Sequence, residues 1–123
     1  MSSDETLINK HCVPCHGGVS ALSPAEAKTM LGRLLSSGPG GWQLIEDGKA
    51  LKREFKFPDF YRAMSFVNAV AHIANVEDHH PDIECGWGYA RIRYQTHAIG
   101  GLHENDFICA AKIDNLPGAR APL

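Results

Sequence analysis

The 123-residue sequence lacks the features that mark several large classes of protein. No apolar run approaches the roughly 20 residues that a membrane-spanning helix needs, and the leading MSSDETLINKH carries charges where a secretory signal has an apolar core. Positive charge is not in excess, since 12 Lys and Arg residues stand against 14 Asp and Glu residues. Internal repeats and low-complexity segments are also missing. We therefore expect a cytoplasmic protein whose partners are neither a membrane nor nucleic acid.

The residues that are present have the composition of an ordinary globular domain. Hydrophobic residues make up 44% and charged residues 21% of the chain, and a chain of this length folds as one domain. The first 22 residues have little periodicity and contain Pro14, Gly17 and Gly18. We expect an irregular arm at 1–22, one domain at 23–118 and a short tail at 119–123.

Within the domain, the sequence pattern predicts three helices and two hairpins. Ser23 and Glu26 form a capping box that begins the first helix, and the Asp47–Gly48 pair suits the positive φ of a tight hairpin turn. In chain order, we expect a helix at about 24–36, a hairpin around 46–49, a helix at 59–76, a second hairpin within 82–95 and a helix from 104 to about 115. Short turns require antiparallel pairing, so the fold class is α+β, a small four-stranded antiparallel sheet with three helices packed on one face.

Two groups of apolar residues indicate which surfaces of the domain are buried. The helix at 59–76 has apolar residues on two sides, which predicts a sheet on one side and another helix or a second subunit on the other. A group of four aromatic residues could serve as a stacking platform, but their strand and helix spacing favours the core. The group is Trp42, Phe55, Phe57 and Phe60.

Among the seven histidines, His79, His80 and His97 stand out because each falls at the end of an expected element. His79 and His80 precede Pro81 at the end of the second helix, and His97 follows the last strand. Asp106 lies in the first turn of the final helix. A single histidine in such a place is usually a surface or capping residue, whereas functional groups commonly gather at element ends. The set together predicts one pocket.

These residues carry a resemblance to a known family. The chain resembles pterin-4a-carbinolamine dehydratase, whose pattern is a His-His-Pro corner, a later Thr-His and an Asp. One departure is Asn75, which stands where many relatives have Glu. The matching runs are His79–His80–Pro81–Asp82, Thr96–His97, Gly101–Leu102–His103–Glu104–Asn105–Asp106, Leu22–Ser23–Pro24–Ala25–Glu26, Gly41–Trp42 and Phe57–Pro58–Asp59–Phe60, so the resemblance extends from residue 22 to about 115.

The resemblance implies a hydro-lyase that converts 4a-hydroxytetrahydropterin to quinonoid dihydropterin and water. Such an enzyme regenerates the tetrahydropterin (tetrahydrobiopterin) used by aromatic amino acid hydroxylases, which suggests a functional link to phenylalanine hydroxylase. The family needs no metal or organic cofactor, because the pterin is the substrate, and it forms homodimers or homotetramers. It implies that His79, His80 and His97 are catalytic, and that the substrate-binding residues are His79, His80, Pro81, Thr96, His97, Ala98 and Ile99.

Dehydration of a carbinolamine suits histidine, because hydroxide must be protonated as it leaves while a ring nitrogen loses a proton. An imidazole with a pKa near 6.5 can act as either acid or base at neutral pH. We expect His79 and His97 to act as the acid and base and His80 to hold the substrate. Asp106 could orient an imidazole, or it could complement the helix dipole.

The arm contains a second motif, Cys12–Val13–Pro14–Cys15–His16, which matches the pattern for covalent haem attachment. That chemistry normally follows export, and no export signal is visible. A zinc site built on Cys12, Cys15 and His16 is a second alternative, and an arm that packs on the domain with free thiols is a third.

Two further functions compete with the dehydratase. Some animal members of the family double as dimerisation cofactors of a homeodomain transcription factor, so the chain could be a coactivator-type binding protein. A metal-dependent enzyme could also use His79, His97 and Asp106 as a facial triad. Metal analysis of the purified protein would separate this last alternative from a cofactor-free dehydratase.

Overall fold

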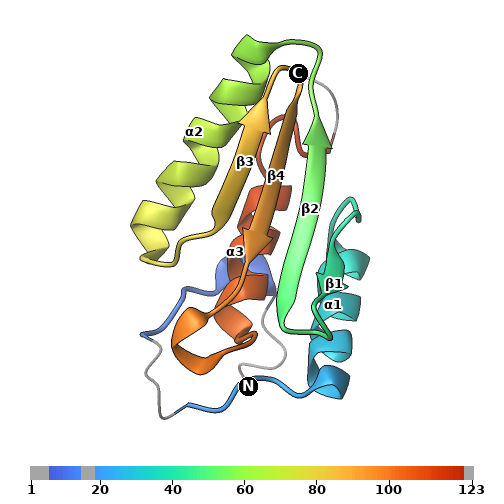
Figure 1. The fold of residues 1–123 in the computed structure, drawn as a ribbon, viewed down its shortest axis with the longest axis vertical. Helices are drawn as coiled ribbons and strands as arrows, with labels where there is room; N and C mark the ends of the chain where they lie inside the picture. The colour runs from blue at the N-terminus through green and yellow to red at the C-terminus, as the bar shows by residue number, and fades with distance from the viewer. Residues whose placement is uncertain (1–5, 15–18, 121–123) are drawn as a thin grey trace.

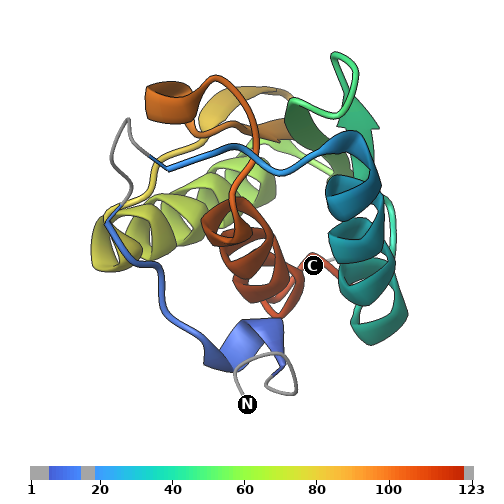
Figure 2. The ribbon, with the colours of Figure 1, turned by 90° about the horizontal axis from the view of Figure 1, so that it is seen from below.

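A computed structural model describes residues 6–14 and 19–120, with three α-helices on one face of a four-stranded sheet (Figure 1). The expected fold class is thereby confirmed. Seen along the sheet, α1, α3 and α2 lie side by side beneath it (Figure 2). The elements are η2 (Leu7–Asn9), α1 (Pro24–Ser37), β1 (Gln43–Ile45), β2 (Ala50–Lys56), α2 (Phe60–Glu77), β3 (Asp82–Gly86), β4 (Tyr89–Tyr94), η3 (His97–Ile99) and α3 (Glu104–Asp114).

Local capping signals begin the helices where the sequence predicts them. The Ser23 hydroxyl accepts from the Glu26 N–H at 3.1 Å, and the Ser23 N–H donates to the Glu26 carboxylate at 2.8 Å. Asp59 caps α2 by accepting from the Arg62 N–H at 2.8 Å. Each bond satisfies a backbone N–H that the first helical turn leaves without a partner.

The sheet is antiparallel throughout, in the order β1-β2-β4-β3. The first hairpin turns through Asp47 and Gly48, whose φ angles of 59° and 81° confirm the predicted positive-φ turn. Both hairpins place apolar residues on the helix-covered face, where Ile92 of β4 lies opposite Ile83 of β3. Short turns therefore decide the pairing within each hairpin, and burial decides which face meets the helices.

Aromatic and aliphatic side chains fill the space between the sheet and the helices. Trp42, Phe55 and Phe57 are buried as expected, and the Phe55 and Phe66 rings lie 4.6 Å apart. The assignment of Phe60 to this core is wrong, because the residue is 48% exposed. The first turn of α2 extends past the end of β3, where the sheet does not cover it (Figure 1).

The outer side of α2 leaves Tyr61 and Val76 strongly exposed. Whether a second subunit covers this side stays a prediction. Within the described ranges, none of the helices has the length and apolar character that crossing a bilayer requires.

A buried polar cluster ties the end of α3 to the first hairpin. Asp114 Oδ1 accepts from Trp42 Nε1 at 2.8 Å and from Arg53 Nη1 at 2.7 Å. Arg53 also donates to the Ala119 carbonyl at 2.9 Å. Burial raises the pKa of the Asp114 carboxyl, although Trp42 and Arg53 favour its ionised form. The cluster is thus stable only while its donors and acceptors remain paired.

We expect Asp114→Ala to lower the free energy of unfolding by about 3 kcal/mol, because it leaves the Arg53 charge and the Trp42 N–H without their buried acceptor. Asp114→Asn should cost less, since an amide oxygen still accepts from Trp42. Urea denaturation followed by tryptophan fluorescence measures both. Glu84→Ala, at an exposed strand position, is the control and should change stability by less than about 0.5 kcal/mol. Equal stability of all three variants would contradict this role.

Candidate active site

The antiparallel pairing of β3 with β4 brings the two histidine segments to the same end of the sheet. Asp82 begins β3 and lies opposite Arg93, one residue from the end of β4. The chain that leads into β3 carries His79 and His80, and the chain that leaves β4 carries His97. Segments that lie about 17 residues apart in sequence therefore become neighbours through sheet register alone.

The sharp end of α2 directs the first histidine segment away from the helix. Asp78 has φ 51° and ψ 44°, a left-handed conformation that Asp tolerates better than most residues. The N–H groups of Asp78 and His79 both donate to the Ala74 carbonyl. The helix thus ends before His80, the residue that Pro81 restricts, and Asp78 makes the turn.

A short loop then carries the chain from β4 into α3. Thr96 pairs with Gly101, whose carbonyl accepts from the Thr96 N–H at 2.8 Å, and this bridge closes the loop that contains η3. His103 follows as the N-cap of α3, because its Nδ1 accepts from the Asn105 N–H at 3.0 Å. The first turn of α3, with Asp106, is thereby placed against Thr96.

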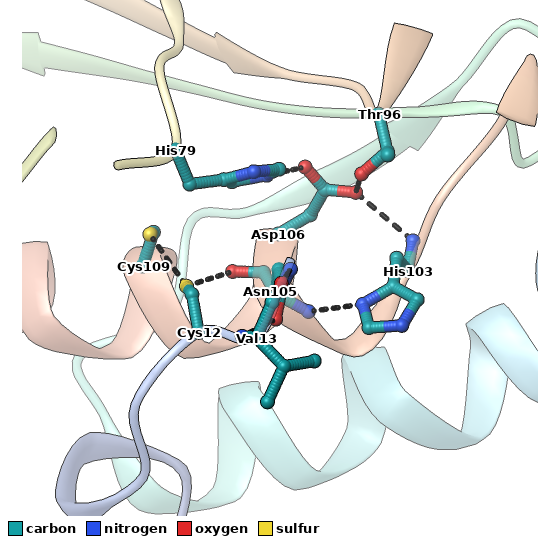
Figure 3. Close-up of polar contacts among 8 residues, drawn as sticks. All are labelled: Cys12, Val13, His79, Thr96, His103, Asn105, Asp106 and Cys109. Carbon is teal, nitrogen blue, oxygen red and sulfur yellow. Dashed lines mark hydrogen bonds and ion pairs between the residues drawn. The ribbon is translucent and has the colours of Figure 1, made fainter. Parts of the chain in front are cut away.

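Asp106 is the residue on which these segments converge (Figure 3). Its carboxylate is fully buried and accepts three hydrogen bonds, from His79 Nε2 at 2.6 Å, from the Thr96 hydroxyl at 2.8 Å and from the His103 N–H at 3.0 Å. Asp106 therefore contacts an imidazole and also completes the capping box of α3. The two alternatives that the sequence left open for Asp106 occur together.

The environment of His79 favours its charged form. Burial opposes a positive charge there, but the hydrogen bond and the negative charge of Asp106 outweigh burial and raise the pKa of His79 above its ordinary value. The ring of Tyr94 lies parallel to that of His79, with centroids 5.8 Å apart and an interplanar angle of 3°. Asp106 and Tyr94 thus fix both the charge and the plane of the imidazole.

A cavity of about 520 Å³ opens over these residues, within the range of roughly 300–1,000 Å³ that is usual for small-molecule sites. It brings together most of the predicted site residues, whereas Pro81 and Ile99 are not part of its lining. Of the histidines in it, His79 is largely buried, while His80 and His97 are exposed. The lining consists of Cys12, Val13, Pro14, Glu77, Asp78, His79, His80, Gln95, Thr96, His97, Ala98 and Asn105.

The arm forms one wall of this cavity, which the sequence reasoning missed. The Val13 N–H donates to Asn105 Oδ1 at 3.1 Å, and Asn105 Nδ2 donates back to the Val13 carbonyl at 2.6 Å. The Cys12 N–H donates to Glu77 Oε1 at 2.7 Å. The arm and Asn105 are 92 residues apart, so no local pattern could have revealed the contact.

Glu77 anchors the arm as a buried carboxylate. Burial favours its neutral form, but the Cys12 N–H, the His11 imidazole at 2.9 Å and the Lys112 ammonium at 3.9 Å outweigh burial and lower the pKa of Glu77. Lys112 also donates to the Ile8 carbonyl at 2.8 Å. A network of polar groups thus holds η2 and the residues that follow it against the rest of the domain, with η2 on the side of α3 away from the sheet (Figure 2).

Among residues 6–14 and 19–120, no three His, Cys, Asp or Glu side chains are grouped so that they could hold a metal ion. The facial triad of His79, His97 and Asp106 is therefore not assembled. Of the zinc and haem motif, Cys15 and His16 lie outside the described residues, and the Cys12 sulfur instead lies 3.5 Å from that of Cys109.

Comparisons with known proteins agree on one family. The sequence model of Pterin 4 alpha carbinolamine dehydratase matches residues 20–116. The "Putative pterin-4-alpha-carbinolamine dehydratase" of Legionella pneumophila (strain Corby) is 49% identical, over 94% of this chain and 97% of its own length. A protein of the same name from Halorhodospira halophila is 50% identical, over 90% and 97%. A crystal structure titled "transcriptional coactivator/pterin dehydratase", from Brucella melitensis, aligns with a TM-score of 0.67 and 30% identity, over 76% of this chain and 95% of that one.

We expect Asp106→Asn to lower the pKa of His79, because the substitution removes the negative charge that offsets burial. Imidazole resonances followed by NMR across pH measure this change. The resonances of His72, which is exposed on α2, should be the same in both proteins. An unchanged titration of His79 would show that Asp106 does not set its protonation.

The interaction between His79 and Asp106 also predicts how the stability of the protein depends on pH. The folded-state pKa of His79 lies above its unfolded value, so its contribution to stability is complete below about pH 6.5 and is lost as pH rises through the folded value. The stability difference between the natural protein and Asp106→Asn should therefore be larger below about pH 6.5 than well above it.

Proposed function

Because the chain belongs to the pterin-4α-carbinolamine dehydratase family, we propose that it removes water from 4a-hydroxytetrahydropterin in the cavity beside His79. The product is the quinonoid dihydropterin. The observation that carries this proposal is that His79, 2.6 Å from the buried Asp106 carboxylate, lines a cavity together with His80 and His97. Such a reaction serves to regenerate the tetrahydropterin that aromatic amino acid hydroxylases consume.

His79 is suited to be the proton donor. Its raised pKa extends the charged form of the imidazole to higher pH, and Asp106 accepts from Nε2, which leaves Nδ1 to donate a proton. Hydroxide is a poor leaving group, so protonation of the departing oxygen is the step that most needs a positioned acid. When the proton has left, the Asp106 hydrogen bond holds the neutral ring in place for the next cycle.

His97 is suited to be the base that takes the proton from the pterin ring nitrogen. It lines the same cavity from η3, on the other histidine segment, and its exposure lets it exchange protons with solvent. Loss of that proton releases the electron pair that forms the C=N bond as the hydroxyl group, protonated by His79, departs as water. His80, also exposed in the cavity, chiefly holds the substrate.

The direct test is a coupled assay with an aromatic amino acid hydroxylase as the source of the carbinolamine. We expect protein treated with EDTA to accelerate the loss of the carbinolamine absorbance, since acid–base chemistry by imidazoles needs no metal. The buffer-catalysed rate has to be subtracted at each pH. If activity vanished with EDTA and returned with added zinc or iron, a metal-dependent reaction would replace this proposal.

Substitution of single histidines separates catalysis from binding. His79→Ala and His97→Ala should each lower kcat by roughly ten- to a thousandfold, because each removes a proton donor or acceptor. His80→Ala should mainly raise KM, because a residue that binds the substrate and the transition state equally affects KM and leaves kcat unchanged.

His72→Ala is the matched control, because His72 lies outside the cavity and is exposed on the same helix that leads to His79. Circular dichroism confirms that each variant is folded. If His79→Ala and His97→Ala kept full turnover, these residues would have no part in the reaction, and the family membership would then indicate the fold alone.

A further inference from the structure

Two cysteine sulfurs from distant parts of the chain meet where Cys12, on the wall of the cavity, contacts the buried Cys109. Cys12 Sγ in the arm lies 3.5 Å from Cys109 Sγ in α3, across a sequence separation of 97 residues (Figure 3). A disulfide bond is about 2.05 Å long, so the sulfurs need to approach by only about 1.5 Å to form one. Cys12 belongs to neither a helix nor a strand, so the arm can supply that movement while α3 stays in place.

We propose that Cys12 and Cys109 form a reversible disulfide when the protein meets a peroxide, and that this bond fastens the arm to α3 as a fixed wall of the cavity.

Hydrogen bonds to the backbone around Cys12 hold its sulfur next to that of Cys109. Glu77 binds the Cys12 N–H at 2.7 Å, and Asn105 binds both backbone polar groups of Val13. The Cys12 sulfur also contacts the Asn105 carbonyl at 3.6 Å. Hydrogen bonds on either side of Cys12 therefore keep its sulfur beside that of Cys109, so that only a small shift of the arm is needed and the encounter of the two sulfurs costs little conformational entropy.

The pKa values of Cys12 and Cys109 are shifted in opposite directions, which favours reaction at Cys109. The hydrogen bond from Cys12 lowers the pKa of the Cys109 thiol, burial opposes this, and the positive charge of His79 adds to the lowering. The pKa of Cys12 is raised, chiefly because its S–H donates to Cys109. Cys109 thus ionises more readily than Cys12, and a thiolate beside a thiol is the arrangement in which a sulfenic acid is captured as soon as it forms.

The chemistry balances with hydrogen peroxide as the oxidant. The Cys109 thiolate attacks one peroxide oxygen, the O–O bond breaks, and a sulfenic acid and hydroxide form. The Cys12 sulfur then attacks the sulfenic sulfur, the S–S bond forms, and the sulfenic hydroxyl leaves as water with the Cys12 proton. Hydroxide takes up the proton that Cys109 had lost. Two thiols and one peroxide thus give one disulfide and two waters. Cys109 is fully buried, but its sulfur touches that of Cys12, which is half-buried on the cavity wall. A molecule as small as peroxide therefore approaches Cys109 from the cavity, past Cys12.

The experiment uses the full chain carrying Cys15→Ser and Cys85→Ser, which leaves Cys12 and Cys109 as its two cysteines out of four. The protein is reduced, freed of metal with EDTA and titrated with hydrogen peroxide. We expect the intact monomer to lose two hydrogen atoms, peptide mapping to join Cys12 to Cys109, and dithiothreitol to reverse the change. Because the bond closes a loop of nearly 100 residues, the Tm should rise by roughly 5 °C or more.

The same chain with Cys12→Ser added is the matched control. It should gain oxygen atoms at Cys109 without a disulfide and without a rise in Tm. Peptide mapping of the oxidised natural chain tests the pairing with all four thiols present and does not depend on how the variants fold. A predominant Cys12–Cys15 bond, disulfide-linked dimers, or thiols that stay reduced would each overturn the proposal.

Discussion

A buried carboxylate with three donors is the interaction on which the end of this fold depends. Asp106 is fully buried, and an ionised carboxylate in that position is stable only if its oxygens are hydrogen-bonded. The donors come from three different segments, namely the end of α2, the loop after β4 and the N-cap of α3. The requirement to satisfy one charge therefore fixes the relative positions of the segments that carry the histidines.

Asn105, the residue before Asp106 on α3, connects the same helical turn to the arm. Asn105 is 2% exposed and pairs with both backbone polar groups of Val13, while Asp106 faces His79 and Thr96. Two adjacent positions of one helical turn thus connect to two different walls of the cavity. Cys109 lies one turn further along α3 and meets Cys12 of the same arm. The first turns of α3 act as the common support for the histidines and for the segment that encloses them.

Most of the secondary structure could be predicted because its causes are local. The capping box at Ser23, the Asp47–Gly48 turn and the cap at His103 each depend on residues no more than four apart. The error over Phe60 has a different cause. Its apolar character predicted burial, but the first turn of α2 extends beyond the sheet, and only the relative lengths of two distant elements decide that.

The sequence by itself determined the three α-helices, the two hairpins with their antiparallel pairing and the identity of the histidine-bearing segments, because turn chemistry and apolar periodicity act over a few residues. Only the tertiary structure decided that Asp106 meets His79, that the arm lines the cavity and that Cys12 meets Cys109. These contacts join residues 27 to 97 positions apart. They form because packing the helices against the sheet buries polar groups that then have to find partners, and no local pattern encodes which partners those are.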